Sequence, residues 1–305
     1  MNITVVGSGK VGASAALNVC LRELGDVLLL DIVKGLPQGE ALDINHQLSE
    51  LGIDCEVRGS NEYEDLKQSE IIVLVAGVGR KPGMTRMDLL TTNANILRDI
   101  ATKIGELASG AIVIVVTNPV DPMTYLTLKI LKADKKRVMG MGNLLDVSRF
   151  KSSIHETTGL SRSSISAMVM GEHGENMLPL PRFSSISGIP LAEFLSPKMI
   201  SNTLNSTRKI AAEVISLKGA TIHAPGNAIA EMIESIVRDK RNIVPVSALL
   251  EGEYGASNVC IGVPAVLGVN GIERIVELEL DSSEREIFDR GVESVKAAVT
   301  ELHIL

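Results

Sequence analysis

Short apolar runs recur along the first half of this chain, at residues 2–6, 27–30, 71–76 and 111–116. Each run is continuous rather than alternating, which is typical of parallel strands that are covered on both faces. An apolar helix is predicted over residues 11–24, between the first two runs. This alternation of strand and helix predicts an α/β fold with an N-terminal, doubly wound parallel sheet of the Rossmann type.

A second helix is predicted between the strands at 71–76 and 111–116. Leu97, Ile100, Ile104 and Leu107 are spaced by three, four and three residues, which places them along one helical face. We interpret this helix as a crossover connection.

After about residue 143 the pattern becomes mixed. We expect a dinucleotide-binding domain over residues 1–143 and a C-terminal α+β substrate domain over 144–305. Its predicted elements are a helix over 201–218 and strands near 165–170, 259–263 and 275–280. A last amphipathic helix is predicted to start at a capping box formed by Ser283 and Glu286.

Composition excludes several classes of protein. The net charge is -7 over 305 residues, and the basic residues are scattered, so we expect no nucleic-acid partner. The longest uncharged stretch, 255–272, contains Pro264 and four glycines, and we expect a buried strand and turn there rather than a membrane span. Because the N-terminus enters a strand without a basic region or cleavage site, we expect no signal peptide or transit segment. Three widely spaced cysteines predict no metal site and a reducing, cytoplasmic setting.

The first strand runs directly into Gly7-x-Gly9-x-x-Gly12, and a helix follows. In this context Gly7 permits a tight turn, Gly9 lets a pyrophosphate approach the backbone, and Gly12 lets the helix lie close to the strand. Asp31 lies 19 residues beyond Gly12, where a carboxylate can accept hydrogen bonds from both ribose hydroxyls. Only Lys34 is near enough to favour a 2′-phosphate, so NAD is preferred over NADP; the alternative for Asp31 is a simple turn residue.

Met-Gly-Glu-His-Gly, residues 170–174, places His173 between glycines after an apolar run. A histidine of near-neutral pKa can accept the hydroxyl proton of an alcohol as its hydride leaves, if a carboxylate fixes its tautomer. A structural histidine is equally compatible with this motif alone. Asp146 and Arg149 are three residues apart and share one face of a predicted helix. Without context they could form an ordinary surface ion pair.

The segment from Gly79 to Arg86 holds three cations after a buried strand. Such a loop could close over an anionic substrate, since arginine matches carboxylates bidentately, although a solvated basic loop is the simpler alternative. Asn118 follows the next strand, at the sheet edge where ligands bind in such folds.

Five motifs stand in a recognisable order: Gly-Ser-Gly-Lys-Val-Gly, Arg-Lys-Pro-Gly-Met-Thr-Arg, Thr-Asn-Pro-Val-Asp, Leu-Leu-Asp-x-x-Arg and Gly-Glu-His-Gly. With them the chain resembles the lactate and malate dehydrogenase family along nearly its whole length. Within the family it looks like the malate dehydrogenases most similar to lactate dehydrogenases, and the segment 218–225 is similar to archaeal members.

The resemblance implies a role for each matching residue. His173 would be the proton donor and acceptor, Asp146 its orienting carboxylate, and Arg149 the clamp on the carboxylate beside the reacting carbon. Arg86 would polarise the substrate carbonyl. Asn118 would serve both cofactor and substrate, with a cis bond to Pro119.

Two further assignments concern the ligands. Asn93 is expected among the cofactor-binding residues. Arg80 occupies the position where, in this family, glutamine goes with lactate and arginine pairs with the second carboxylate of malate. An arginine enclosed with a monoacid would be left unpaired, at a cost of roughly 3–5 kcal/mol. We give Thr221 and His223 no role.

These observations predict NAD-dependent, reversible oxidation of (S)-malate to oxaloacetate, a reaction of the tricarboxylic acid cycle. The alternatives are a dehydrogenase of lactate or another 2-hydroxy acid and a non-catalytic dinucleotide-binding module. In relatives the helix at 40–51, which carries His46, packs across a subunit interface, so a homodimer or homotetramer is expected. Strictness toward NAD, kinetic constants and the physiological direction are not readable from the sequence.

Overall fold

The computed structural model describes residues 1–79 and 83–302. All four predicted N-terminal strands are present and almost entirely buried. They are β1 (Asn2–Val6), β2 (Asp26–Leu30), β4 (Ile71–Leu74) and β5 (Ile112–Val115). The helix predicted at 11–24 is α1 (Lys10–Cys20), so it ends earlier than expected.

The N-terminal strands form a parallel sheet. With β3 (Val57–Ser60) and β6 (Val138–Gly140), the order is β3-β2-β1-β4-β5-β6, and every neighbouring pair is parallel. This order is that of the Rossmann fold, whose ligands bind outside the carboxyl ends of the strands where the strand order reverses. The predicted fold class is confirmed.

The sheet continues into the C-terminal half of the chain. Ser247 of β12 (Asn242–Glu251) pairs with Gly140 of β6 in antiparallel register. Beyond β12 follow β13 (Ser257–Gly268), β8 (Val169–Gly171) and β9 (Met177–Pro179), and β14 (Gly271–Ile275) pairs with β13. A separate small sheet contains β7 (Ile165–Ser166), β10 (Ser185–Ile186) and β11 (Ile189–Pro190). The predicted domain boundary after residue 143 stays a prediction.

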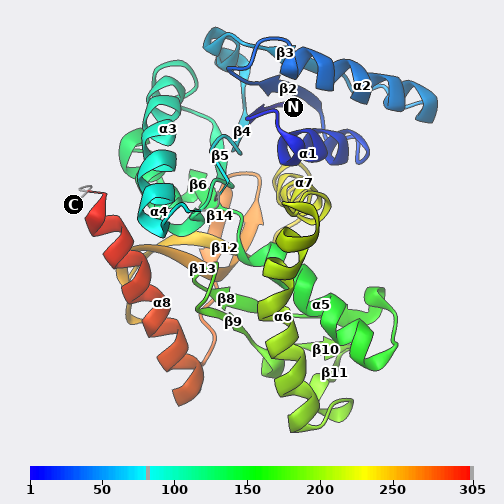
Figure 1. The fold of residues 1–305 in the computed structure, drawn as a ribbon, viewed down its shortest axis with the longest axis vertical. Helices are drawn as coiled ribbons and strands as arrows, with labels where there is room; N and C mark the ends of the chain where they lie inside the picture. The colour runs from blue at the N-terminus through cyan, green and yellow to red at the C-terminus, as the bar shows by residue number, and fades with distance from the viewer. Residues whose placement is uncertain (80–82, 303–305) are drawn as a thin grey trace.

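Helices cover both faces of the sheet (Figure 1). On one side lie α3 (Arg86–Leu107) and α4 (Val120–Leu131), and on the other lie α1 and α7 (His223–Val237). The remaining helices are α2 (Leu36–Leu51), α5 (Asn143–Thr158), α6 (Pro197–Lys218) and α8 (Ser282–Glu301). The predicted helices at 97–107, 201–218 and the C-terminus correspond to α3, α6 and α8.

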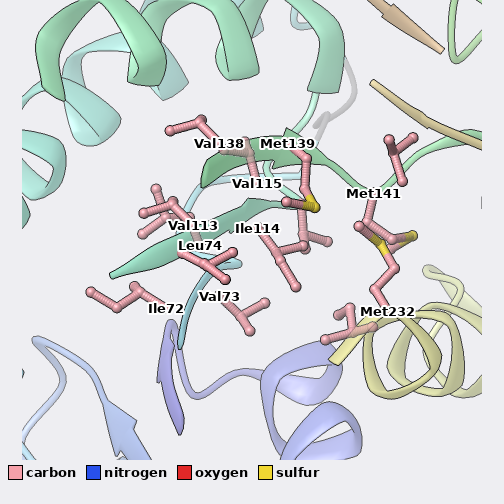
Figure 2. Close-up of a cluster of buried hydrophobic side chains, with 14 of the residues drawn as sticks. Ile72, Val73, Leu74, Val113, Ile114, Val115, Val138, Met139, Met141 and Met232 are labelled. Atoms are coloured by element: carbon pink, nitrogen blue, oxygen red, sulfur yellow. The ribbon is translucent and has the colours of Figure 1, made fainter. Parts of the chain in front are cut away.

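One apolar core joins the two halves of the chain. Strands β4, β5 and β6 place Val73, Ile114 and Met139 on one face of the sheet, in a cluster that Met141 extends (Figure 2). Met232 of α7, fully buried, enters the same cluster from the C-terminal half. The C-terminal elements therefore pack directly onto the N-terminal parallel sheet. This packing fixes the positions of site residues from the two halves relative to one another.

Three sequence predictions are wrong in detail. The strand predicted at 275–280 is absent, since β14 covers 271–275; beyond it the Tyr254 hydroxyl donates to the Val276 carbonyl (2.7 Å) and accepts from the Leu278 amide (2.9 Å). The run 165–170 is split between β7 and β8, which belong to different sheets. The capping box of α8 is formed by Asp281 and Glu284, two residues before the predicted pair.

Within the described residues, no helix combines the length and the apolar character that crossing a membrane requires. The uncharged stretch at 255–272 contains all of β13, the turn after it and the first residues of β14.

Candidate active site

The glycine loop after β1 has the geometry that its sequence predicts. Gly7 has a φ of +105°, and a Cβ there would lie 2.6 Å from the Ala76 amide nitrogen. A Cβ on Gly12 would lie 1.9 Å from the Gly7 carbonyl oxygen. Both positions therefore exclude any larger side chain, and α1 can begin directly against the strand.

Gly9 differs from Gly7 and Gly12, because a Cβ at position 9 would meet no atom of the described chain within 4 Å. It is the N-cap of α1 and no side chain caps this helix end, so the first amides of α1 are free to bind an anion. Asp31, directly after β2, accepts hydrogen bonds from the amides of Ser8 (2.7 Å) and Val33 (2.9 Å). Its carboxylate thus adjoins the glycine loop, at the edge where a dinucleotide ribose would lie.

Asn93 and Asn118 are brought together at the ends of β4 and β5. The Asn93 side chain is buried and donates to the carbonyls of Asn118 (2.7 Å) and Val78 (3.1 Å), while its oxygen accepts from the Val78 amide (2.8 Å). Asn93 therefore connects the loop after β4 to the loop after β5 by hydrogen bonds. The Asn118 residue itself is exposed, and its peptide bond to Pro119 is cis, as expected.

His173, Asp146 and Arg149 form a hydrogen-bonded trio. The His173 Nδ1 lies 2.7 Å from Asp146 Oδ2, and Arg149 Nη1 donates to Asp146 Oδ1 at 2.7 Å. Asp146 is fully buried and the other two side chains are 14% and 12% exposed. Asp146 and Arg149 do share one face of α5, yet they are not the surface ion pair that the sequence left open.

The electrostatics of this trio favour a charged imidazole. Burial by itself lowers the pKa of His173, but the charge and the hydrogen bond of Asp146 act in the opposite direction and the pKa is raised overall. Arg149 opposes this increase. Since Asp146 occupies Nδ1, the remaining ring nitrogen, Nε2, is the atom that can exchange a proton with a substrate.

Arg86 is the first residue of α3, and its guanidinium forms an ion pair with Glu175, two residues beyond His173. Thr85 caps this helix through a capping box with Asp88. Arg86 therefore lies beside the histidine loop. Arg80 lies outside the described residues. Within residues 1–79 and 83–302, no group of three His, Cys, Asp or Glu side chains is arranged to hold a metal ion.

One residue at the site received no role from the sequence. Asp121, the second residue of α4, is 1% exposed and accepts a hydrogen bond from the main-chain amide of His173 at 2.8 Å. It is the last residue of the Thr-Asn-Pro-Val-Asp motif, which was the only signal that could have drawn attention to it.

Two family models together match nearly the whole chain. Residues 1–140 match the family model of the lactate/malate dehydrogenase NAD binding domain, and residues 144–303 match that of the lactate/malate dehydrogenase alpha/beta C-terminal domain. The chain belongs to the lactate/malate dehydrogenase family. As a member of that family it is an NAD-dependent oxidoreductase.

Individual members of the lactate/malate dehydrogenase family are similar over the full chain. A malate dehydrogenase of Aeropyrum pernix is 43% identical over 301 residues, which are 98% of each chain. The structure of Cryptosporidium parvum malate dehydrogenase superposes with a TM-score of 0.96 at 36% identity, covering 100% of this chain and 99% of that one. A Cryptosporidium parvum lactate dehydrogenase complexed with lactic acid and the dinucleotide reaches 0.94 at 35% identity, with 99% and 98% covered. The fold alone therefore does not distinguish the two substrates.

Proposed function

We propose that this chain catalyses the reversible, NAD-dependent oxidation of (S)-malate to oxaloacetate, with His173 as the proton acceptor and Asp146 as its partner. The observation that carries the chemistry is the buried His173–Asp146–Arg149 trio, which joins a base, its orienting carboxylate and an anion clamp. A non-catalytic dinucleotide-binding module would have no use for this combination.

The residues at the strand ends suit a dinucleotide. The open space at Gly9 and the uncapped start of α1 suit a pyrophosphate, and Asp31 suits the adenosine ribose. When bound, NAD supplies the acceptor for the hydride that leaves C2 of the hydroxy acid. Asn93 would act indirectly, since its amide atoms bond to the loops after β4 and β5.

In the direction of malate oxidation, His173 takes the substrate hydroxyl proton at Nε2. The resulting imidazolium donates from Nδ1 to Asp146, whose negative charge stabilises it in a site with little exposure to water. In the opposite direction the same proton returns from Nε2 to the oxygen of oxaloacetate. The raised pKa of His173 favours the charged form that this return step requires.

Arg149 is proposed to bind the carboxylate next to the reacting carbon, because one of its nitrogens is held by Asp146 and the remaining donors of the guanidinium fork can face a ligand. Arg86 is proposed to polarise the reacting carbonyl. Its ion pair with Glu175 is exposed, and exposed pairs contribute only about 0–1 kcal/mol, so a substrate oxygen can replace Glu175 at little cost. Asn118 is proposed as a donor to substrate or cofactor.

The choice of malate over lactate depends on Arg80 and on the relatives. The Aeropyrum pernix relative and one of the two Cryptosporidium parvum proteins carry the name malate dehydrogenase. A guanidinium at position 80 would pair with the second carboxylate of malate, which lactate lacks. A lactate dehydrogenase is the alternative, since the fold accommodates it equally well.

The test is a comparison of kcat/KM for oxaloacetate and pyruvate, followed by the absorbance of the reduced nicotinamide. We expect a strong preference for oxaloacetate. In Arg80→Gln the preference should shift toward pyruvate, whereas Lys81→Gln removes the neighbouring charge and should leave the ratio unchanged. A wild-type preference for pyruvate would reject malate as the substrate, and the absence of turnover with either acid would favour the non-catalytic module.

We also infer that the enzyme binds the small dicarboxylates malate and oxaloacetate and that it acts in the cytoplasm. We further infer that it is at least a dimer. Leu42 of α2 is 61% exposed and Leu217 of α6 is 79% exposed, which leaves apolar side chains on the outer faces of both helices. Light scattering coupled to size exclusion tests this inference. A monomer at micromolar concentration would contradict it.

A further inference from the structure

Asp121 is a buried carboxylate that the proposed chemistry does not use. It lies in the first turn of α4, at the positive end of that helix dipole, and only 1% of its surface is exposed. Its Oδ2 accepts from the main-chain amide of His173 at 2.8 Å. Among the described residues, none donates a hydrogen bond of ordinary geometry to its other oxygen.

The contact with His173 is part of a tight packing arrangement. A Cβ on Gly142, at the start of α5, would lie 2.8 Å from the His173 Cβ, so the histidine is seated directly against the main chain. Asp146 holds the imidazole from α5 and Asp121 holds the backbone amide from α4. Two carboxylates from two helices thus hydrogen-bond to His173. Asp146 bonds to its ring, and Asp121 bonds to its backbone amide.

Keeping a carboxylate ionised in a buried place is costly, and such groups are concentrated at functional sites. Burial raises the pKa of Asp121 to about 6, while the Ser247 hydroxyl and His173 act to lower it and Glu172 raises it. The remaining group that faces it is the Cys260 thiol of β13, whose pKa is raised well above its usual value by burial. The negative charge of an ionised Asp121 in turn raises the pKa of His173.

We propose that Asp121 is a positioning residue for His173, which fixes the backbone that carries the imidazole and adds a second buried negative charge beside the ring. The role is distinct from that of Asp146, since Asp121 touches neither the ring nitrogens nor the substrate side of the site. The assignment of a catalytic task to His173 rests on the proposed function, but the hydrogen bond between its backbone amide and Asp121 does not.

The test uses Asp121→Asn, whose carboxamide oxygen can still accept from the His173 amide but carries no charge. The imidazole of His173 is titrated by NMR in the full chain, which is tractable because the protein has only five histidines. We expect the midpoint of His173 to move to lower pH than in the wild type. An unchanged midpoint would overturn the proposal.

Glu284→Gln is the matched control, because it also removes one buried carboxylate, at the start of α8, where its partner is Arg182. The midpoint of His173 should stay in place in this variant. An equal shift in Glu284→Gln would also overturn the proposal, since any lost negative charge would then suffice.

If Asp121→Asn does not fold, Ser247→Ala provides the same information. Loss of the hydroxyl that lowers the pKa of Asp121 makes the carboxylate protonate at higher pH, so the midpoint of His173 should again fall, by less than in the asparagine variant. A midpoint identical to the wild type would contradict the role of Asp121.

Turnover gives a second readout. In Asp121→Asn the pH limb of kcat/KM should move to lower pH for malate oxidation and for oxaloacetate reduction alike, with KM little changed. Asp121→Ala, which also loses the acceptor, should lose more of kcat. A chain that shows the NMR shift without any turnover of malate would reject the proposed function and leave the positioning role standing.

Discussion

Replacement of Asp146 by asparagine tests the site most directly. The side chain keeps its shape, but the negative charge that faces His173 Nδ1 and Arg149 Nη1, both at 2.7 Å, is lost. With charge centres about 4 Å apart and an effective dielectric constant of about 20, the imidazolium loses about 4 kcal/mol of stabilisation. This energy corresponds to a decrease of roughly 10³-fold in kcat for malate oxidation.

The assay is the initial rate of formation of the reduced nicotinamide, measured over a pH range that brackets the ordinary histidine pKa of about 6.5. KM should rise less than kcat falls, because Arg149 keeps its place on α5. Glu284→Gln again serves as the control, as it removes a buried carboxylate whose partner is also an arginine. A fall in kcat of less than about tenfold in Asp146→Asn would refute the reasoning, since it would mean that less than about 1.4 kcal/mol depends on this charge.

Further predictions concern the cofactor edge and the pH dependence of stability. Gly7→Ala should lower the melting temperature, since position 7 has φ +105° and no room for a Cβ. Gly9→Ala should leave the melting temperature unchanged but weaken NAD binding, measured by fluorescence titration. The reverse pattern would contradict the assigned roles. Asp31→Ser should weaken NAD binding by roughly 10- to 100-fold, the value of a charged hydrogen bond of about 1.5–3 kcal/mol, and weaken NADP binding less; equal losses would argue against a ribose contact. The folded pKa of Asp121, about 6, is above its unfolded value, so its protonation stabilises the fold below about pH 4 and this contribution is lost as the pH rises through about 6. Urea unfolding should therefore show a decrease of about 3 kcal/mol in the wild type relative to Asp121→Asn over that interval, and parallel pH curves would contradict it.

Much of this protein could be predicted from local sequence patterns. The strands of the parallel sheet are continuous apolar runs, and the glycine spacing after β1 follows from steric demands that act within a few residues, as the close approach of Gly12 to Gly7 demonstrates. Asp146 and Arg149 were correctly placed on one helical face because three residues make nearly one turn.

The remainder depends on contacts between distant segments. Position 173 meets Asp121 and Asp146, which are 52 and 27 residues away, only because the first turns of α4 and α5 meet the chain that leaves β8. The Tyr254 hydroxyl bonds to the backbone where a strand was predicted, and β12 extends the sheet by pairing with β6. Hydrophobic periodicity reports which face of an element is buried but not which partner buries it. The strands, the helices and the chemistry of each motif were therefore readable from the sequence. The arrangement of charges around the imidazole was decided by tertiary packing.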